Sequence, residues 1–191
     1  MSDKTKSVKD EILEWIKALL IALAIILVVR WLAFNPFLVD GESMRPNFQD
    51  GEMIVVNKLI YEFRDPRRGE VIVFLAPEGK DFIKRIIALP GERVRVEGDR
   101  VYVNDQVLEE GYLTEAIEAA RALGRSYNNG NYSVTAEVTV PENTLFVLGD
   151  NRSHSKDSRF PDVGFVSYDQ IVGRADLVYW PIRELGIVQH E

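Results

Sequence analysis

The hydrophobic pattern of the first fifth of the chain differs from that of the rest. Residues 18–29 carry no charged side chain, but a helix of that length spans only about 18 Å. Extending it from Trp15 to Phe34 gives about 30 Å, the thickness of a bilayer core. The two basic residues inside this stretch lie close enough to its ends to snorkel toward water. The pattern therefore predicts one transmembrane helix as an anchor over residues 15–35.

The charges around this segment predict its orientation. Four lysines precede it or lie in its first turn: Lys4, Lys6, Lys9 and Lys17. By the positive-inside tendency, residues 1–14 form a cytoplasmic segment and the chain from residue 36 onward lies outside. A cleaved secretory signal is the alternative, but Trp31 and Phe34 stand where the small residues of a cleavage site are needed. A buried soluble helix would need a polar face that this stretch lacks.

Past residue 36 the apolar residues occur in short runs rich in valine, isoleucine and aromatics, bounded by Gly, Pro, Asn or Asp. Such runs are typical of strands, and they cover residues 53–57, 71–75, 82–89, 134–140, 144–148 and 171–179. Residues 93–97 and 100–104 alternate strictly around a Gly-Asp turn, which predicts a hairpin with one solvated face. We expect residues 36–191 to form a mainly β, antiparallel domain.

One helix interrupts this β pattern. Thr114 is a suitable N-cap, acidic residues follow in the first turns, and Gly124 is a suitable stop. The helix is short and rich in alanine. We expect a helical and loop insertion at about residues 113–132 that packs on the sheet.

Composition restricts the possible chemistry. The 191 residues are 46% hydrophobic, enough for one core, and the formal net charge of −7 argues against a nucleic-acid partner. The chain has no cysteine and two histidines, of which His190 is next to the C-terminus. Thiolate nucleophiles are thus excluded, and we expect no metal site and no cofactor.

A serine and a lysine remain as candidates for nucleophilic catalysis. Ser43 follows the apolar segment closely, and at full extension the chain from Phe34 reaches at most about 30 Å. Lys84 shares a predicted strand face with Phe82 and Ile86, where burial would favour its neutral amine. Each residue alone also fits an ordinary role, as a loop hydroxyl or as a lysine that reaches solvent.

A polar run over residues 149–159 follows the predicted strand 144–148. It contains two acids, two arginines and three serines. It could be a solvated loop with Asx-type turns, or a hydrogen-bonded network that orients a catalytic base.

Four segments, in order and behind one apolar segment, resemble the motif boxes of bacterial type I signal peptidases, most closely the short Gram-positive form. They are Ser43-Met44-Arg45-Pro46, Gly69 to Phe74, Lys84 to Glu92, and Gly149 to Arg152 with Ser155, Asp157, Ser158 and Arg159. The resemblance covers nearly the whole chain. It implies a membrane-bound serine endopeptidase that removes signal peptides from secretory precursor proteins at the outer face of the phospholipid membrane.

The resemblance also implies roles for individual residues. Ser43 would be the nucleophile and Lys84 the general base, with Ser155 orienting the lysine and with Asp157 and Arg159 holding the loop. The oxyanion would bind the backbone N–H next to the nucleophile and, in some members, a hydroxyl two residues upstream.

Two details of the substrate site remain open at this stage. Gly41 occupies the position of the upstream hydroxyl, so the second oxyanion donor is not identified. The resemblance implies that the substrate binds as an added strand with small side chains at alternate positions, and Met44 is a candidate for contact with it.

Three alternatives remain. Cytosolic autoproteases also use serine and lysine, but they lack an anchor. A hydrolase triad could combine His154 with Asp150 or Asp157. The chain could also be an anchored β domain that binds precursors or other partners without catalysis.

Overall fold

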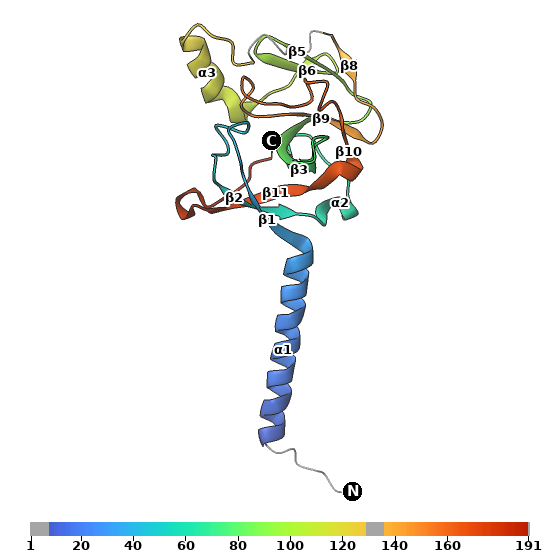
Figure 1. The fold of residues 1–191 in the computed structure, drawn as a ribbon, viewed down its shortest axis with the longest axis vertical. Coiled ribbons are helices and arrows are strands. Elements are labelled where there is room, and N and C mark those ends of the chain that lie inside the picture. The colour runs from blue at the N-terminus through green and yellow to red at the C-terminus, as the bar shows by residue number, and fades with distance from the viewer. Residues whose placement is uncertain (1–7, 129–135, 191) are drawn as a thin grey trace.

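The computed structural model of the chain describes residues 8–128 and 136–190, and only the backbone of residues 8, 10 and 25–34. A long helix, α1 (Val8–Ala33), extends away from a β-rich domain (Figure 1). Within the described part of the chain, no helix is both long enough and apolar enough to cross a membrane. The predicted anchor falls partly outside that part, since the side chains of residues 25–34 are not described.

The helix ends two residues earlier than the sequence predicted. Phe34 and Asn35 belong to a strand, β1 (Phe34–Leu38), instead of the last turn of α1. The reason lies in Pro36, because a residue that precedes proline is driven toward extended backbone. The chain thus passes from helix to sheet without a linker.

The larger sheet is antiparallel in every described pairing, which confirms a mainly β domain. Its strands lie in the order β1, β2, β11, β3, β4, β9 and β10, with β12 paired to β11. Their bounds are β2 (Met53–Asn57), β3 (Val71–Leu75), β4 (Asp81–Ala88), β9 (Thr144–Leu148), β10 (Val166–Ser167), β11 (Ile171–Trp180) and β12 (Gly186–Ile187). The short edge strands β1, β10 and β12 were not expected from the sequence.

A smaller sheet contains the predicted hairpin. Its order is β7, β6, β5, β8, with β5 (Arg93–Glu97), β6 (Arg100–Val103), β7 (Gln106–Val107) and β8 (Val138–Thr139). The strand predicted over residues 134–140 begins outside the described residues, and within its described part, residues 136–140, only Val138–Thr139 form a strand, β8. The remaining helices are α2 (Ile60–Phe63), α3 (Thr114–Ala122) and 3-10 turns at Gly111–Leu113, Tyr168–Gln170 and Ile182–Glu184.

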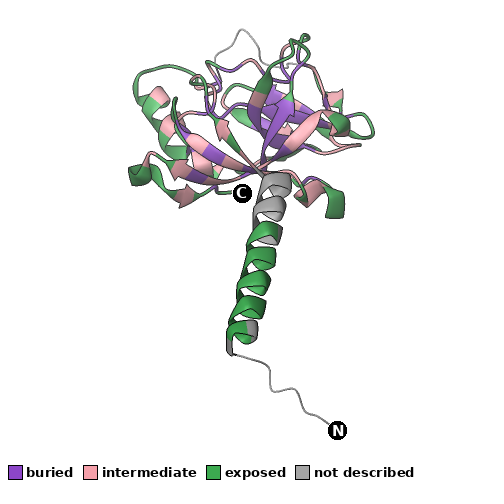
Figure 2. Cartoon of the chain, turned by 60° about the horizontal axis from the view of Figure 1, so that its bottom comes forward, coloured by how far each residue is buried: buried purple, intermediate pink, exposed green. Residues whose placement is uncertain are grey.

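Strand β4 lies at the centre of the fold and is buried on both faces. Ile83 packs with Val73 in one cluster, whereas Ile86 packs with Ile72 in another. The buried segments gather where the strands cross in the middle of the domain (Figure 2). A strand covered on both faces is a near-continuous apolar run, which explains why this segment was recognisable from sequence.

The inserted helix α3 begins one residue earlier than the predicted N-cap at Thr114 implies. Thr114 is the first helical residue, with φ −52° and ψ −51°, and Leu113 stands at the N-cap without a side-chain cap. The preceding 3-10 turn already winds the backbone, so Thr114 has no extended conformation from which to cap. Gly124 does end the helix, with a φ of +67° that glycine adopts readily.

The C-terminal segment is held in place up to residue 190. The Val71 N–H donates to His190 Nδ1 at 3.3 Å, and Arg85 donates to the Gln189 carbonyl at 3.0 Å. His190 is half-buried, and burial, followed by the charge of Arg174, lowers its pKa. This histidine therefore serves as a backbone acceptor.

Candidate active site

Lys84 lies where strand β4 loses one of its two neighbours. On one side it pairs with Ile72 of β3, but on the other side β9 pairs with β4 only from Arg85 to Ala88. Strand β9 ends at Leu148, opposite Arg85, and the polar run 149–159 begins there. The end of β9 thus leaves the edge of β4 open at the lysine, beside the polar loop.

The ammonium or amine of Lys84 meets the hydroxyl of Ser43. Lys84 Nζ donates to Ser43 Oγ at 2.8 Å and to the Ile83 carbonyl at 2.7 Å. The lysine is only 3% exposed, and its Nζ lies 5.1 Å from the centre of the Phe82 ring. Burial lowers the pKa of Lys84 from 10.5 to about 8, against the opposing charges of Asp157 and Asp150. The amine is therefore available in its neutral form near neutral pH.

A groove of about 290 Å³ opens beside this pair. Besides Ser43 and Lys84, it is lined by apolar and by charged residues: Phe37, Leu38, Phe82 and Ile83, and Asp40, Lys80, Asp81 and Lys156. Met44 is not among the lining residues, since it is 1% exposed and packs in the core with Val39 and Phe48. In this arrangement Met44 supports the loop that carries Ser43 and does not reach the groove.

Ser155 and Gly149 lie tightly against the backbone of Ser43. A Cβ atom at residue 149 would fall 2.1 Å from Ser155 Oγ and 2.5 Å from the Ser43 carbonyl oxygen. Only glycine leaves room for these two atoms. Ser155 Oγ is buried and has no hydrogen-bond partner among the described residues, so the bond to Lys84 implied by the family resemblance is not formed here.

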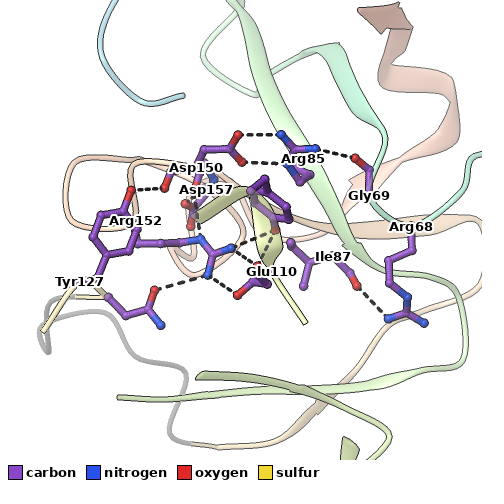
Figure 3. A network of polar contacts seen from close by, with 12 residues as sticks. Arg68, Gly69, Arg85, Ile87, Glu110, Tyr127, Asp150, Arg152 and Asp157 are labelled. Carbon is purple, nitrogen blue, oxygen red and sulfur yellow. Dashed lines mark hydrogen bonds and ion pairs between the residues drawn. The ribbon is translucent and has the colours of Figure 1, made fainter. Parts of the chain in front are cut away.

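Two buried ion pairs fix the polar loop. Asp157 accepts from Arg159 Nε at 2.8 Å and from the Gly149 N–H at 3.0 Å. Asp150 accepts from Arg85 Nε at 2.9 Å and Nη2 at 2.8 Å (Figure 3). Both carboxylates are therefore already paired with arginine side chains.

His154 has a different environment from that of Lys84. It is exposed, and its Nδ1 lies 2.9 Å from Ser153 Oγ. Neither Asp150 nor Asp157 contacts it in the described structure. The geometry thus favours a lysine over a histidine as the partner of Ser43.

A third buried arginine joins the polar loop to the inserted segment. Arg152 donates to the Gly149 carbonyl at 3.1 Å and pairs with Glu110 (Figure 3). The Tyr127 hydroxyl donates to the Asp150 carbonyl at 2.7 Å. Residues 110–127 are thereby connected to the loop that lies against Ser43.

The sequence did not indicate several of these contacts. Asn151 belongs to the recognised motif, but no role could be given to it, and it contacts the backbone on both sides of Ser43. Asn47 donates to Asp150 at 2.8 Å, and Glu110 pairs with Arg152. These partners lie far apart in the chain, so no local pattern could have paired them. For Arg85, the available signal was a positive charge inside an apolar run.

Comparison with known proteins gives a consistent result. The family described as signal peptidase, peptidase S26, matches residues 12–180. Signal peptidase I P of Bacillus subtilis subsp. natto is 37% identical over 189 residues, covering 97% of this chain and 98% of the relative. Signal peptidase IB of Staphylococcus aureus strain COL is 36% identical over 183 residues, covering 92% and 93%.

A solved structure also matches. The crystal structure of a signal peptidase I from Enterococcus faecalis V583 is 35% identical, with a TM-score of 0.46, and the match covers 58% of this chain and 97% of that chain. Together, the match of the family to residues 12–180 and the near full-length relatives show that this chain belongs to the signal peptidase family, peptidase S26.

Proposed function

We propose that this member of the signal peptidase family removes N-terminal signal peptides from secreted precursors with Ser43 as nucleophile and Lys84 as general base. The observation that carries the proposal is the 2.8 Å contact between Lys84 Nζ and Ser43 Oγ in a buried setting. A serine hydroxyl is a weak nucleophile until a base within hydrogen-bond reach removes its proton. Lys84 meets this requirement in distance and in its lowered pKa.

The contacts of Lys84 suit the proton transfers of peptide hydrolysis. In the neutral amine, one N–H donates to the Ile83 carbonyl and the lone pair can face the Ser43 hydroxyl. Ser43 Oγ attacks the scissile carbonyl carbon while its proton passes to Lys84. The ammonium then gives that proton to the leaving amine, and the neutral lysine activates a water that hydrolyses the acyl-enzyme. Ser155, which is buried beside Gly149, and the ion pair Asp157–Arg159 hold the polar loop in place against Ser43 and Lys84.

The open edge of β4 offers a place for the precursor. Strand β9 ends opposite Arg85, so residues 81–84 lie along the groove without a β9 neighbour. An extended peptide could add to this edge through main-chain hydrogen bonds, with alternate side chains directed into the groove. Phe82 and Ile83 would then meet small apolar side chains before the cut.

We further propose that α1 anchors the domain in a membrane with the N-terminus in the cytoplasm. The described apolar side chains of α1 are exposed, Trp15 at 78% and Leu19 at 70%, and the helix extends away from the domain (Figure 1). Exposed large apolar residues along a helix need a partner, and lipid is the one that the lysine-rich start of the chain fits. Ser43 would then lie near the outer leaflet, where a signal peptide leaves the bilayer.

Cleavage of a secretory precursor tests the proposed activity. The purified full-length chain in detergent should cut the precursor at the end of its signal peptide, as measured by mass spectrometry of both products. Because only neutral Lys84 accepts a proton, kcat/KM should rise about tenfold per pH unit below about 8 and level off above it. A rate that is constant from pH 6 to pH 9 would contradict lysine as the base.

Membrane association needs a separate measurement. After expression in bacteria, the full chain should stay with membranes during an alkaline carbonate wash, whereas a chain that begins at Phe34 should be released. Protease added outside spheroplasts should digest the domain of the full chain. Release of the full chain by carbonate, or protection of its domain, would contradict the proposed anchor or its orientation.

A further inference from the structure

Asn151 is hydrogen-bonded to the two peptide groups that flank the nucleophile. Its side-chain Nδ2 donates to the Glu42 carbonyl at 3.0 Å, and its backbone N–H donates to the Ser43 carbonyl at 3.0 Å. One residue of the polar loop therefore holds the peptide before Ser43 and the peptide after it.

The bond from Asn151 Nδ2 to the Glu42 carbonyl also determines the direction of the Ser43 N–H. The Glu42 carbonyl and the Ser43 N–H belong to one planar, trans peptide group, so they point in opposite directions. Holding the carbonyl oxygen with Asn151 Nδ2, and with the Arg45 N–H at 3.1 Å, also fixes the direction of the Ser43 N–H. Among the described residues, no acceptor bonds to that N–H. It is thus an oriented, unused backbone donor beside the nucleophile.

Further contacts hold Asn151 itself. Ser153 Oγ donates to Asn151 Oδ1 at 3.3 Å, which sets the amide so that its nitrogen faces Glu42. The Asp150 carbonyl and the Asn151 N–H are opposite ends of another peptide group, and the Tyr127 hydroxyl donates to that carbonyl at 2.7 Å (Figure 3). A hydrogen bond at one end of a peptide group also strengthens the bond at the other end.

Because residue 41 is a glycine, the direction of the Ser43 N–H matters more for binding the oxyanion. Its φ of +101° is a conformation that side-chain-bearing residues rarely adopt, and its N–H donates to Asp50 Oδ1 at 2.7 Å. The turn therefore suits glycine, which has no hydroxyl to act as a second oxyanion donor. More of the oxyanion stabilisation then depends on how well the Ser43 N–H is aimed.

From these contacts, we infer that Asn151 is a positioning residue that aims the Ser43 N–H at the developing oxyanion, and that Tyr127 of the inserted segment fixes Asn151 in that role. The inference rests on the proposed function, since it needs Ser43 to form a tetrahedral intermediate. Asn151 is not among the residues that line the groove beside Ser43. It acts through the Glu42–Ser43 peptide group.

Three variants test the inference in the full-length chain. Asn151→Asp keeps the shape but places a carboxylate oxygen against the Glu42 carbonyl, Asn151→Ala removes the side chain, and Tyr127→Phe removes one hydroxyl. Loss of an oxyanion donor costs about 10²–10³-fold in kcat, so we expect misdirection to cost about 10–100-fold at Asn151. The smaller loss of Tyr127→Phe should be about 3–10-fold. KM should not change, and the pH midpoint should stay the same in Asn151→Ala and Tyr127→Phe, because neither variant adds a charge near Lys84.

An inhibitor comparison separates positioning from general destabilisation. A peptide aldehyde with small residues adds to Ser43 Oγ and places its oxygen in the oxyanion position, whereas the matching peptide amide binds without reaction. The aldehyde should lose affinity in proportion to the fall in kcat/KM, and the amide should not. Tyr102→Phe, a tyrosine of the small sheet whose ring stacks on Arg95, is the matched control and should behave like the wild type.

The outcomes distinguish failure of the positioning role of Asn151 from failure of the proposed function. Asn151 variants with wild-type kcat, or with a loss confined to KM, would overturn the inference, and so would equal losses of aldehyde and amide affinity. If the Asn151 variants do not fold, Tyr127→Phe decides by the same criteria. Failure of the proposed function has a different signature, because the wild type would then leave the precursor uncut or Ser43→Ala would cut it.

Discussion

Replacing Lys84 by alanine should lower precursor cleavage by at least about 10⁴-fold, and Ser43→Ala should lower it equally. The lysine is the one base within hydrogen-bond distance of Ser43 Oγ among the described residues, so the hydroxyl would keep its proton in the variant. The two residues act as a unit, and the double variant should be no worse than either single one. Cleavage rates at pH 8, measured with a large excess of enzyme, would show this.

Stability and a matched histidine variant provide the controls. Lys84→Ala removes a group that is costly to bury when charged, so its thermal midpoint should not fall, which separates loss of catalysis from loss of fold. His154→Ala should cut the precursor at nearly the wild-type rate, because His154 is exposed and bonds to Ser153. Full activity of Lys84→Ala would end the dyad proposal, and loss of activity in His154→Ala would favour a triad.

The largest effect on stability is expected from Asp150→Ala. Arg85 is 2% exposed, and the carboxylate of Asp150, which accepts two hydrogen bonds from it, neutralises its positive charge. Removing one partner of a buried ion pair leaves a buried charge and costs about 3–5 kcal/mol. For a domain of this size the thermal midpoint should fall by roughly 10 °C. Calorimetry or circular dichroism in detergent would measure the shift.

The same chemistry at the surface is the matched control. Asp105 pairs with Arg93 at 2.5 Å, but both side chains are about half exposed. Water replaces such a partner readily, so Asp105→Asn, which removes the charge but keeps a side chain that tolerates the φ of +66° at this position, should leave the thermal midpoint nearly unchanged. Equal shifts in the two variants would show that burial of the Arg85–Asp150 pair does not matter for stability.

The strands of the core were predictable from sequence because their signal is local. Residues 53–57, 71–75 and 144–148 form strands with the predicted bounds, since runs of branched apolar residues between turn residues leave little choice of register. The burial of Lys84 followed from the same apolar pattern, because Phe82 and Ile86, its neighbours on the same face of the strand, are apolar. Short edge strands such as β12 have only two residues and no period to read.

The parts of the site that sequence could not predict depend on contacts across the fold. Asn151 bonds to Glu42 over a separation of 109 positions, and Arg152 bonds to Glu110 over 42. Met44 resembles any apolar residue next to a nucleophile until the loop is folded, and then its side chain points into the core. Ser155 was expected to bond to the lysine, but its hydroxyl points at Gly149 in this structure.

The direct passage from α1 into β1 has a mechanical consequence. A flexible linker would let an anchored domain reach cut sites at many heights above the membrane, but here the first residue after the helix is already paired in the sheet with β2. Ser43 is then held at a nearly constant height above the end of the helix. In the proposed anchored form, the height of Ser43 above the membrane therefore helps to select the cleavage site. A precursor is cut where a suitable pair of small residues reaches that height, and the same pair farther along the precursor is not cut.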